Sequence, residues 1–417
     1  MKTRLALVTG VLLLPLPACA GIELGDSISI DGFGTVGMYR AQDGVAGYRA
    51  DPTQDVYSRN STRFDGDSQL SLQATLKPGG PLSGVVQLLS KRDVEGSLRP
   101  RVEWAYLSWD VQRDLNLKFG RTVAPIFLMS DYRNLNYAQT MVRPPSDAYV
   151  VNPITHQDGV SAAWKRRFSR GALLLEGFYG KTSVQFAQGT VDFSGLWGVA
   201  AKWTQGPFVL RAGQVQARLA VQAPAISAGV AAIASLPASY CSNCAGVGEI
   251  TQLERSDVTI WTVGAVYERD DWLVHAEWMR HSGGSIAIGQ VESAWLMGGY
   301  RMGAFTPYVS VSQYMTGTPN PALRAGPAAP PAVRAQLDYL NVSNLAAGNA
   351  DRKSASLGLR WDVREKMALK FQFDHVRARA PQIGTNATMV VPTSLLGKAS
   401  GFDGSIEVFT LNLDFAF

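Results

Sequence analysis

The chain ends in the stretch FTLNLDFAF, residues 409–417, in which large apolar side chains alternate with mostly polar ones. Because successive side chains of a β-strand point to opposite faces, this stretch predicts a strand with one apolar face and one polar face. In a soluble sandwich the apolar face packs against a second sheet, whereas in a membrane barrel it faces lipid and the polar face lines a wet interior. The rest of the sequence has to distinguish these two settings.

The same two-residue period recurs along the chain, and no long helical period interrupts it. It is clearest in residues 69–76, 305–312, 354–362 and 367–374. The pattern predicts about sixteen strands, beginning near residues 25, 67, 83, 101, 114, 157, 171, 192, 206, 256, 270, 290, 303, 353, 366 and 405. An even number is what a barrel requires when both of its ends lie on the periplasmic side.

Short and long connections alternate between the predicted strands. Residues typical of tight turns mark the short ones, as at 77–80 and 269–271. The long ones cover about residues 41–66, 122–157, 218–255, 316–352 and 380–404. Repeated long loops argue against a soluble sandwich. The sequence therefore predicts an all-β fold, a transmembrane antiparallel β-barrel of about sixteen strands with long extracellular loops and short periplasmic turns.

The composition agrees with such a barrel. Of the 417 residues, 46% are hydrophobic and 18% are charged. The mean hydropathy of -0.01 excludes a bundle of transmembrane helices, which need about 20 apolar residues per span. Lipid offers no hydrogen-bond partners, so a sheet in a membrane has to close on itself. Because about sixteen strands leave an aqueous lumen, the sequence predicts a water-filled hole and not a packed core.

The N-terminus has the features of an export signal. Two basic residues precede the apolar stretch 5–16, and the sequence Ala-Cys-Ala at 18–20 fits the small-x-small cleavage pattern. We expect residues 1–20 to be a cleaved signal peptide and residues 21–417 to form a single barrel domain. The alternative is a lipoprotein signal with Cys19 acylated, which the preceding proline fits poorly.

Two further cysteines, Cys241 and Cys244, predict a disulfide that closes a very small loop, because exported proteins form disulfides. One alternative is a redox C-x-x-C motif, which would require a βα context. The other is half of a zinc site, which would need about four ligands. No histidine or further cysteine lies near the pair in the sequence, so a disulfide is favoured.

STRFDG at 61–66, LKFGR at 117–121, FTPY at 305–308, LGLRWD at 357–362 and the terminal Phe417 occur in this order, and together they resemble the Gram-negative outer-membrane porin superfamily. The resemblance spans the mature chain. It implies a sixteen-stranded barrel, usually a homotrimer, whose third external loop folds inward and narrows the channel. It also implies export to the cell outer membrane, contact with lipopolysaccharide, and barrel-assembly machinery that reads Phe417 as a signal.

Loop 122–157 is the expected constriction loop, because its many aromatic and apolar residues would be unnecessary in a loop that extends into solvent. Its acids Asp131 and Asp147 are the candidate constriction carboxylates. The candidate bases on the barrel wall are Arg63, Lys118 and Arg121. Arg63 lies an even number of residues from the polar positions of the second predicted strand, so its side chain is expected to point inward. For Arg121 the resemblance implies a pore-facing position, which would need a bulge at Gly120, and the alternative is an outward side chain at the membrane interface.

Strand parity also predicts which charged residues face the lumen. Those positions are Lys118, Lys165, Lys202, Arg211, Arg360 and Lys370, with Asp31, Glu176, Asp192, Glu277, Asp362, Asp374 and Asp414. The two signs nearly balance, so the sequence does not fix a charge selectivity. Acids facing bases across a narrow water column would orient dipolar solutes and exclude apolar ones.

The predicted function is a porin, a water-filled channel for passive diffusion of small hydrophilic solutes and ions. The main alternative is a substrate-specific outer-membrane channel for a carboxylate or aromatic nutrient. An outer-membrane enzyme would need a nucleophile beside a base, and none of the four histidines lies in a recognisable motif of that kind. An adhesin acting through the long loops is a further alternative. We expect no cofactor, no metal and no nucleic-acid partner.

Overall fold

The structure is a computed structural model of the chain. It describes residues 21–42, 47–49, 51, 53–54, 58–149, 153–186, 189–247, 255–283, 290–316, 323–346, 351–379, 396–397 and 403–417. The expected signal peptide, residues 1–20, lies outside these described residues.

The main sheet contains 18 strands, and without the two short strands β1 (Ile22–Leu24) and β4 (Thr62–Arg63), sixteen strands form the wall of a barrel. These are β2 (Ile28–Gln42), β5 (Gln69–Leu76), β6 (Leu82–Lys91), β7 (Arg101–Gln112), β8 (Leu115–Val123), β9 (His156–Phe168), β10 (Gly171–Phe186), β11 (Gly189–Gln205), β12 (Phe208–Gln222), β13 (Ser256–Arg269), β14 (Trp272–Gly283), β15 (Val291–Tyr300), β16 (Phe305–Thr316), β17 (Asp351–Arg364), β18 (Met367–Arg379) and β20 (Asp403–Ala416). All neighbours are antiparallel, and β2 pairs with β20 to close the sheet. The predicted fold class is confirmed.

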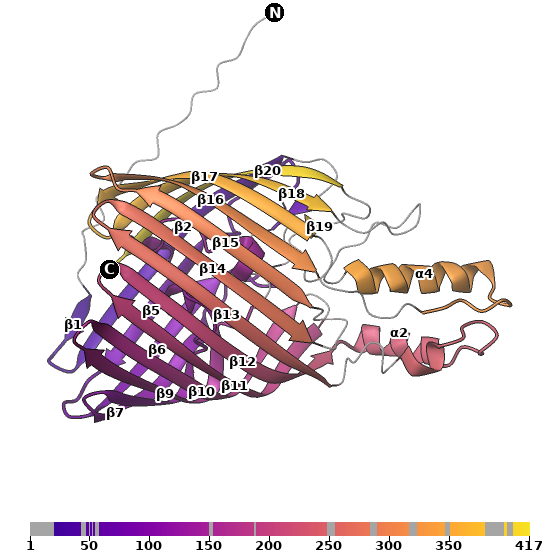
Figure 1. Cartoon of the computed structure of the whole chain (residues 1–417), viewed down its shortest axis with the longest axis horizontal. Coiled ribbons are helices and arrows are strands. Elements are labelled where there is room, and N and C mark those ends of the chain that lie inside the picture. The colour runs from indigo at the N-terminus through magenta and orange to yellow at the C-terminus, as the bar shows by residue number, and fades with distance from the viewer. Residues whose placement is uncertain are drawn as a thin grey trace, which may run out of the picture.

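The two ends of the barrel differ. Figure 1 shows short turns at one end, together with β1 and the C-terminus, and helices α2 (Pro224–Ala234) and α4 (Pro331–Ala346) projecting beyond the other end. We call these the short-turn end and the long-loop end. The alternation of connections is less strict than predicted, because only residues 187–188 separate β10 from β11 at the long-loop end.

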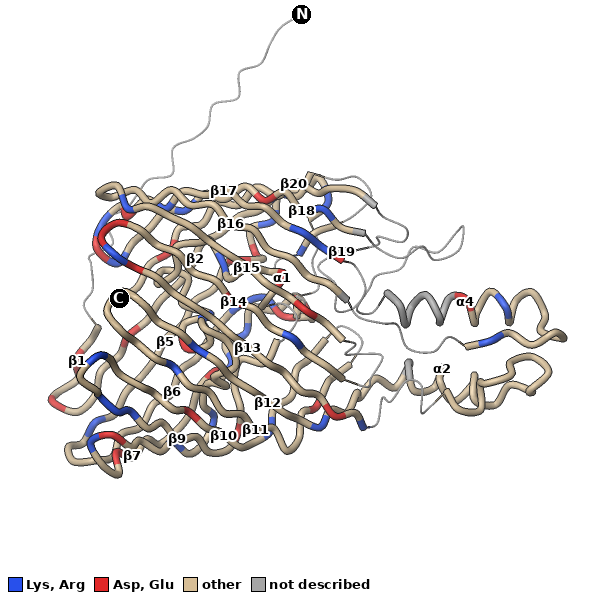
Figure 2. Tube along the Cα trace, in the orientation of Figure 1, with Lys and Arg blue, Asp and Glu red and all other residues tan. Residues whose placement is uncertain are grey.

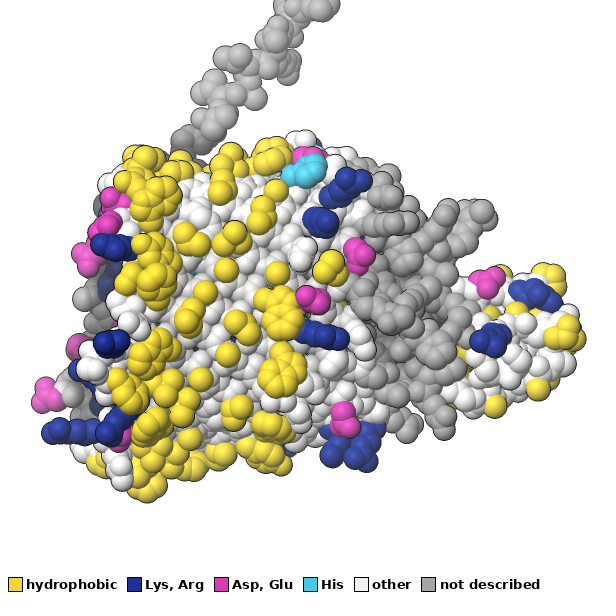
Figure 3. Space-filling model, viewed as in Figure 1, with side chains coloured by type: hydrophobic (Ala, Val, Ile, Leu, Met, Phe, Trp, Pro, Cys, Tyr) yellow, Lys and Arg dark blue, Asp and Glu magenta, His cyan; other side chains and the backbone are white. Residues whose placement is uncertain are grey.

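An apolar belt covers the outer wall. Outward side chains such as Val36, Leu107 and Tyr179 are 63%, 66% and 62% exposed, as expected of residues that face lipid. Pairs of aromatic rings follow the rim at the short-turn end, where Figure 3 shows many apolar side chains. These pairs are Phe168–Trp203, Phe208–Tyr267, Trp272–Tyr300, Phe305–Trp361 and Phe415–Phe417. Such a girdle marks the level of a membrane interface.

The terminal strand has the two faces that its sequence predicts. Thr410, Asn412 and Asp414 are 1%, 0% and 0% exposed and point into the barrel. The rings of Phe415 and Phe417 lie on the outer face above two glycines of β2. A Cβ at Gly32 would lie 2.2 Å from Cζ of Phe417, so only glycine leaves room for this ring.

The described residues between β8 and β9, 124–149 and 153–155, lie inside the barrel, and we call them the inner loop. It contains the short helices η1 (Ser130–Tyr132), η2 (Asn136–Ala138) and α1 (Ser146–Tyr149). Its residues Ile126, Phe127 and Met129 are 1–2% exposed and belong to an apolar cluster. The wall contributes to this cluster with inward side chains of β10 to β16, among them Phe178, Val215, Ile260, Met279, Trp295, Met297 and Tyr308. The prediction of a water-filled hole without a packed core was therefore wrong on this side of the interior.

Two long loops meet beyond the barrel and form a small external module, residues 223–247 and 323–346. Its core contains Ile233, Val247, Leu323 and Leu337, together with both cysteines. A disulfide joins Cys241 and Cys244, whose Cα atoms are 5.4 Å apart. Helix α2 carries no Lys, Arg, Asp or Glu, as Figure 2 shows. Among the described residues, no helix is long and apolar enough to cross a membrane.

Candidate functional site

The inner loop is fastened to the wall on two flanks. The apolar flank, residues 124–129, packs against β10 to β16. The charged flank, residues 136–147, is bound by side chains of β2, β16, β17, β18 and β20 and of the segment before β5. The space that remains between the inner loop and the rest of the wall is the candidate pore.

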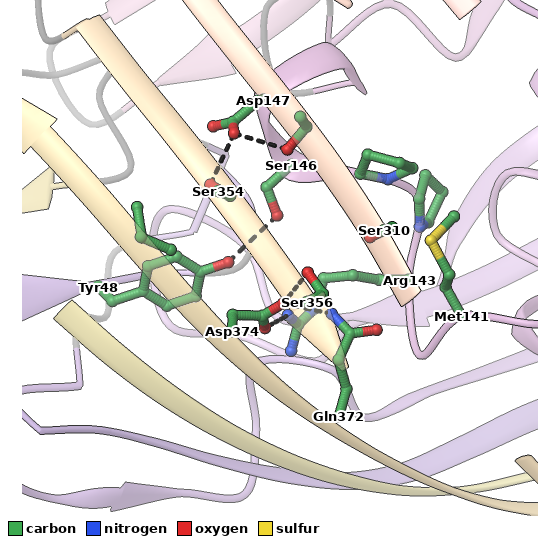
Figure 4. Close-up of a pocket in the computed structure, with 14 residues that line it drawn as sticks. Tyr48, Met141, Arg143, Ser146, Asp147, Ser310, Ser354, Ser356, Gln372 and Asp374 are labelled. Atoms are coloured by element: carbon green, nitrogen blue, oxygen red, sulfur yellow. Dashed lines mark hydrogen bonds and ion pairs between the residues drawn. The ribbon is translucent and has the colours of Figure 1, made fainter. Parts of the chain in front are cut away.

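Asp147, the last residue of the charged flank, anchors this flank to the barrel wall. Its carboxylate lies 3.0 Å from Nε of Arg352 and accepts hydrogen bonds from Ser312 and Ser354 at 2.8 and 2.7 Å. Asp147 is 1% exposed. Figure 4 shows it beside Ser354 at the edge of a polar cavity of about 30 Å³. The expectation that Asp147 is a carboxylate of the pore constriction is therefore corrected, because this acid fastens the loop and has no open water in front of it.

Arg143 is a second anchor of the charged flank. Its guanidinium donates to both carboxylate oxygens of Asp67, at 3.0 and 2.6 Å, and lies 3.8 Å from Asp374. Burial alone would lower the pKa of Arg143, but the two carboxylates outweigh it and raise the pKa well above its usual range. The guanidinium therefore stays charged inside the barrel.

Two bases of the wall bind carbonyl groups of the charged flank. Lys370, which is 0% exposed, donates to the carbonyl oxygens of Asn136 and Met141 at 2.5 and 3.0 Å, and it pairs with Asp414 at 2.9 Å. Arg360 donates to two further carbonyls of the loop, at 2.7 and 2.8 Å. These bases face inward as parity predicts, yet the inner loop covers them.

The apolar flank also has polar fastenings. The carbonyl of Ile126 accepts from Arg211 at 2.8 Å and from Thr262 at 2.9 Å. Glu277 accepts from the amide of Leu128 and from the Tyr149 hydroxyl, both at 2.7 Å. The Phe127 and Tyr149 rings, 4.8 Å apart, pack beside these contacts. Backbone groups that enter the apolar cluster are thus paired, as buried polar groups must be.

Asp131 and Lys118 approach the same part of the remaining lumen. Asp131 is exposed on the inner loop, and Lys118 lies 5.0 Å from the centre of the Tyr106 ring on the wall. Glu176 of β10 is within electrostatic reach of both charges. This side of the lumen combines an acid on the loop with bases on the wall.

Arg63 and Arg121 occupy other places. Arg63 pairs across the sheet with inward-facing Tyr39, and it forms an ion pair with Asp65 at 3.0 Å near the long-loop end. Arg121 is on the outer wall, where it binds both oxygens of Asp158 at 2.7 and 2.8 Å.

The pairing of β8 with β7 and β9 continues without a shift through Gly120, so the bulge that would turn Arg121 inward is absent from these strands. The expected place of Arg121 at the pore is corrected. The outward alternative is the observed one.

Among the other charged positions, Asp192 was assigned to the wrong face. The register of β11 shifts between Ser194 and Trp197, beside Gly195 with a φ of +54°. The bulge turns Asp192 outward, where it accepts a hydrogen bond from Ser183. One extra residue in a strand shifts the two-residue period, so the side chains that precede the bulge point to the opposite face from the one that alternation predicts.

Two cavities lie beside the inner loop and share Arg133 and Asn134. One, of about 80 Å³ near the long-loop end, is lined by residues that include Asp51, Lys91 and Arg143. The other, of about 320 Å³, extends to the C-terminal residues and includes Asp131, Glu103 and Trp104 in its lining. Asn134 donates to Glu103 at 3.1 Å between them. Arg133, Asn134 and Glu103 could not be predicted from the sequence, because loop residues have no periodicity and Glu103 is the extra residue of β7 at a register shift in the β6–β7 pairing.

No cluster of three or more His, Cys, Asp or Glu side chains suited to a metal ion occurs among the described residues.

The closed sixteen-stranded barrel with a loop folded into its interior is the fold of the outer-membrane porins. The sequence matches no protein-family model and no curated protein. Similar solved structures include the outer membrane channel DcaP of Acinetobacter baumannii, with a TM-score of 0.56 and 12% identity over 96% of this chain and 100% of that one. Salmonella typhi OmpF in complex with daunomycin has a TM-score of 0.54 and 12% identity over 95% and 100%. OmpT of Vibrio cholerae in its trimer form has a TM-score of 0.52 and 10% identity over 94% and 100%.

Proposed function

We propose that this protein is an outer-membrane channel for the passive diffusion of small hydrophilic solutes and ions. The observation that carries the proposal is a closed barrel with an apolar outer belt, whose interior keeps cavities lined by charged and polar side chains as well as apolar ones beside a fastened inner loop. A lumen lined by paired charges and water favours hydrated solutes over apolar ones. The long-loop end faces the outside of the cell in this proposal.

Single-channel conductance in planar bilayers tests the proposal. We expect the purified, folded protein to give discrete current steps in potassium chloride, and reversal potentials in a salt gradient to report its charge selectivity. A folded barrel that inserts into the bilayer and carries no current would overturn the channel function. Boiled protein in the same detergent is the control for leakage.

A substrate-specific channel is a second candidate, and the 320 Å³ cavity favours it. Cavities of this size bind small organic molecules when polar groups converge on an apolar lining. Current that one solute class blocks and others do not would favour this candidate over a general porin.

We further propose Lys118 with Asp131 as a charged pair of the constriction, and Arg63 as a base near the external mouth. In this proposal residues 1–20 are a signal peptide for export, the cell is Gram-negative, and the barrel is a homotrimer that contacts lipopolysaccharide. The trimer form of OmpT supports the oligomeric state. Mobility in detergent with and without heating tests it, since a barrel trimer shifts sharply on heating.

Phe417 is proposed as the residue that assembly machinery reads at the C-terminus. Its ring stacks on Phe415 and covers Gly32, so it also belongs to the closing seam between β2 and β20. Deleting Phe417 should lower the amount of assembled barrel in the outer membrane. Unchanged levels of heat-modifiable protein after this deletion would count against the proposal.

A further inference from the structure

The 320 Å³ cavity differs in charge from the rest of the interior. It lies between the inner loop and the wall formed by β2, β5, β6 and β7. Its ionisable side chains are three carboxylates, on Asp31, Glu103 and Asp131, and one guanidinium, on Arg133. Three acids and one base leave the lining with a negative balance, whereas the charges that fasten the inner loop are closely paired.

Glu103 is the central observation. It is 9% exposed, and its Oε1 accepts a hydrogen bond from Asn134 at 3.1 Å. The guanidinium of Arg133 lines the same cavity and lies within electrostatic reach of Glu103, as does that of Arg121. One guanidinium in the lining does not balance three carboxylates, so a cation that enters the cavity would offset the repulsion among them.

Apolar groups complete the lining. Trp104, Phe33 and Leu135 contact the same cavity as the three acids. Nε1 of Trp104 is buried and has no hydrogen-bond partner among the described residues, which leaves this donor for water or for an oxygen of a bound molecule. The indole ring offers a flat apolar surface and a face that attracts cations.

From the size, the acids and the aromatic wall we propose that this cavity binds small organic cations that carry an apolar or aromatic body, such as aromatic amines. The ammonium group lies between Glu103 and Asp131, and the apolar body lies against Trp104 and Phe33. This inference rests on the proposed channel function, of which it names a solute class. It predicts that such amines enter the channel and occupy it longer than neutral or anionic molecules of the same shape.

Benzylammonium is a suitable probe, with benzyl alcohol and benzoate as neutral and anionic molecules of the same shape. Current block in bilayers and titration calorimetry of the folded full-length protein in detergent both measure its binding. We expect benzylammonium to bind at least about tenfold more tightly than the other two, because a charge-assisted hydrogen bond to a buried carboxylate contributes that much. Equal binding of all three molecules would overturn the proposal.

The variant Glu103→Gln keeps the shape of the side chain and removes its charge. It should weaken benzylammonium binding by about tenfold and leave benzyl alcohol binding unchanged. Glu365→Gln is the matched control, since this carboxylate lies in the exposed turn between β17 and β18. Asp131→Asn is a second test at an exposed loop position, in case the buried variant does not fold. Benzylammonium affinity that is unchanged in both cavity variants would contradict the assigned site.

Calorimetry and conductance together distinguish failure of the cation site from failure of the channel function. Ionic current without any preference for benzylammonium would overturn the cation site and leave the channel function in place. Selective binding in detergent by a protein that carries no current would overturn the channel function and support the site.

Discussion

The two flanks of the inner loop are held by opposite kinds of contact. On the apolar flank, Ile126 and Phe127 pack into a cluster with inward-facing side chains of β10 to β16. On the charged flank, Arg143 and Asp147 form ion pairs with Asp67 and Arg352. Apolar packing stabilises in proportion to the area buried and has little directional preference, whereas ion pairs and hydrogen bonds act only at a defined geometry. The apolar flank therefore stabilises the docked loop without selecting one exact position, and the charged flank fixes that position.

The difference also determines which part of the lumen remains wet. Where the loop is fastened, the inward residues are either apolar or already paired with the loop. Opposite the exposed face of Asp131 the wall keeps Lys118 and Glu176, which face water. Substitutions that remove one kind of contact at a time should show, through conductance and hydrogen exchange, which contacts hold the inner loop in place.

The largest effect is expected from Asp147→Ala. It removes the carboxylate that pairs at 3.0 Å with Arg352, whose side chain is 4% exposed inside the barrel. Breaking a buried ion pair from one side destabilises by about 3–5 kcal/mol. The charged flank should detach, so that single-channel conductance rises and hydrogen exchange of residues 143–149 accelerates. Asp257→Ala is the control, because this side chain is 88% exposed on the outer rim, and equal changes in both variants would contradict the anchor.

A somewhat smaller effect is expected from Phe127→Ala on the apolar flank. Phe127 is 2% exposed, and truncating a buried phenylalanine costs about 3–4 kcal/mol. Conductance should rise, but exchange should accelerate first at residues 124–129 and not at the charged flank. Phe64→Ala is the matched control, since Phe64 is 66% exposed. If hydrogen exchange accelerates at both flanks together in either variant, the flanks form one cooperative unit and are not held independently.

The sequence predicted the barrel well because strand alternation and turn residues are local signals. Each of the sixteen predicted strand starts lies within three residues of an observed one. Closure through the terminal stretch followed from the need to pair every backbone group in lipid. The errors on the wall were at Gly120 and Gly195, because a glycine at a strand position permits a bulge but does not require one.

The inner loop was less predictable. Its aromatic residues indicated that it folds into the barrel, but no local pattern distinguishes Asp131, which is exposed, from Asp147, which is buried beside Arg352. That difference depends on residues about 200 positions away in the chain, at Ser354 and Arg352. One signal was available for the apolar flank, since β15 has the run Trp295-Leu296-Met297, which is apolar on both faces. Such a run in a barrel strand indicates that something covers the inner wall.

A weaker effect is expected from acid. Burial would raise the pKa of Asp51, but Lys91 at 3.2 Å and the hydroxyl and amide of Thr53 outweigh it and hold the pKa well below its usual range. A carboxyl group with a lowered pKa in the folded state stabilises above its unfolded pKa of about 3.9, and this contribution disappears as the pH falls through the folded value. The stabilisation that Asp51 provides should therefore be complete from neutral pH to about pH 4 and decline below it, while the contact with Lys91 in the folded protein persists until the pH approaches the folded pKa.

The midpoint temperature of unfolding in detergent, recorded between neutral pH and about pH 3, measures this effect, with Asp51→Asn as the comparison. The variant should lose the part of the decrease below about pH 4 that Asp51 causes. An unchanged acid response in Asp51→Asn would show that another carboxyl group is responsible.

The smallest effect on the channel is expected from the external module. Replacing Cys241 and Cys244 by serine removes a cross-link that closes a very short loop, worth about 2 kcal/mol to the module in the chain-entropy model. Because the module has a core of its own, hydrogen exchange of residues 224–247 should accelerate while conductance stays the same. If conductance instead rose as far as in Phe127→Ala, the external module would also stabilise the position of the inner loop. The contrast between the two flanks would then be incomplete, because the position of the loop would depend on a third contact outside the barrel.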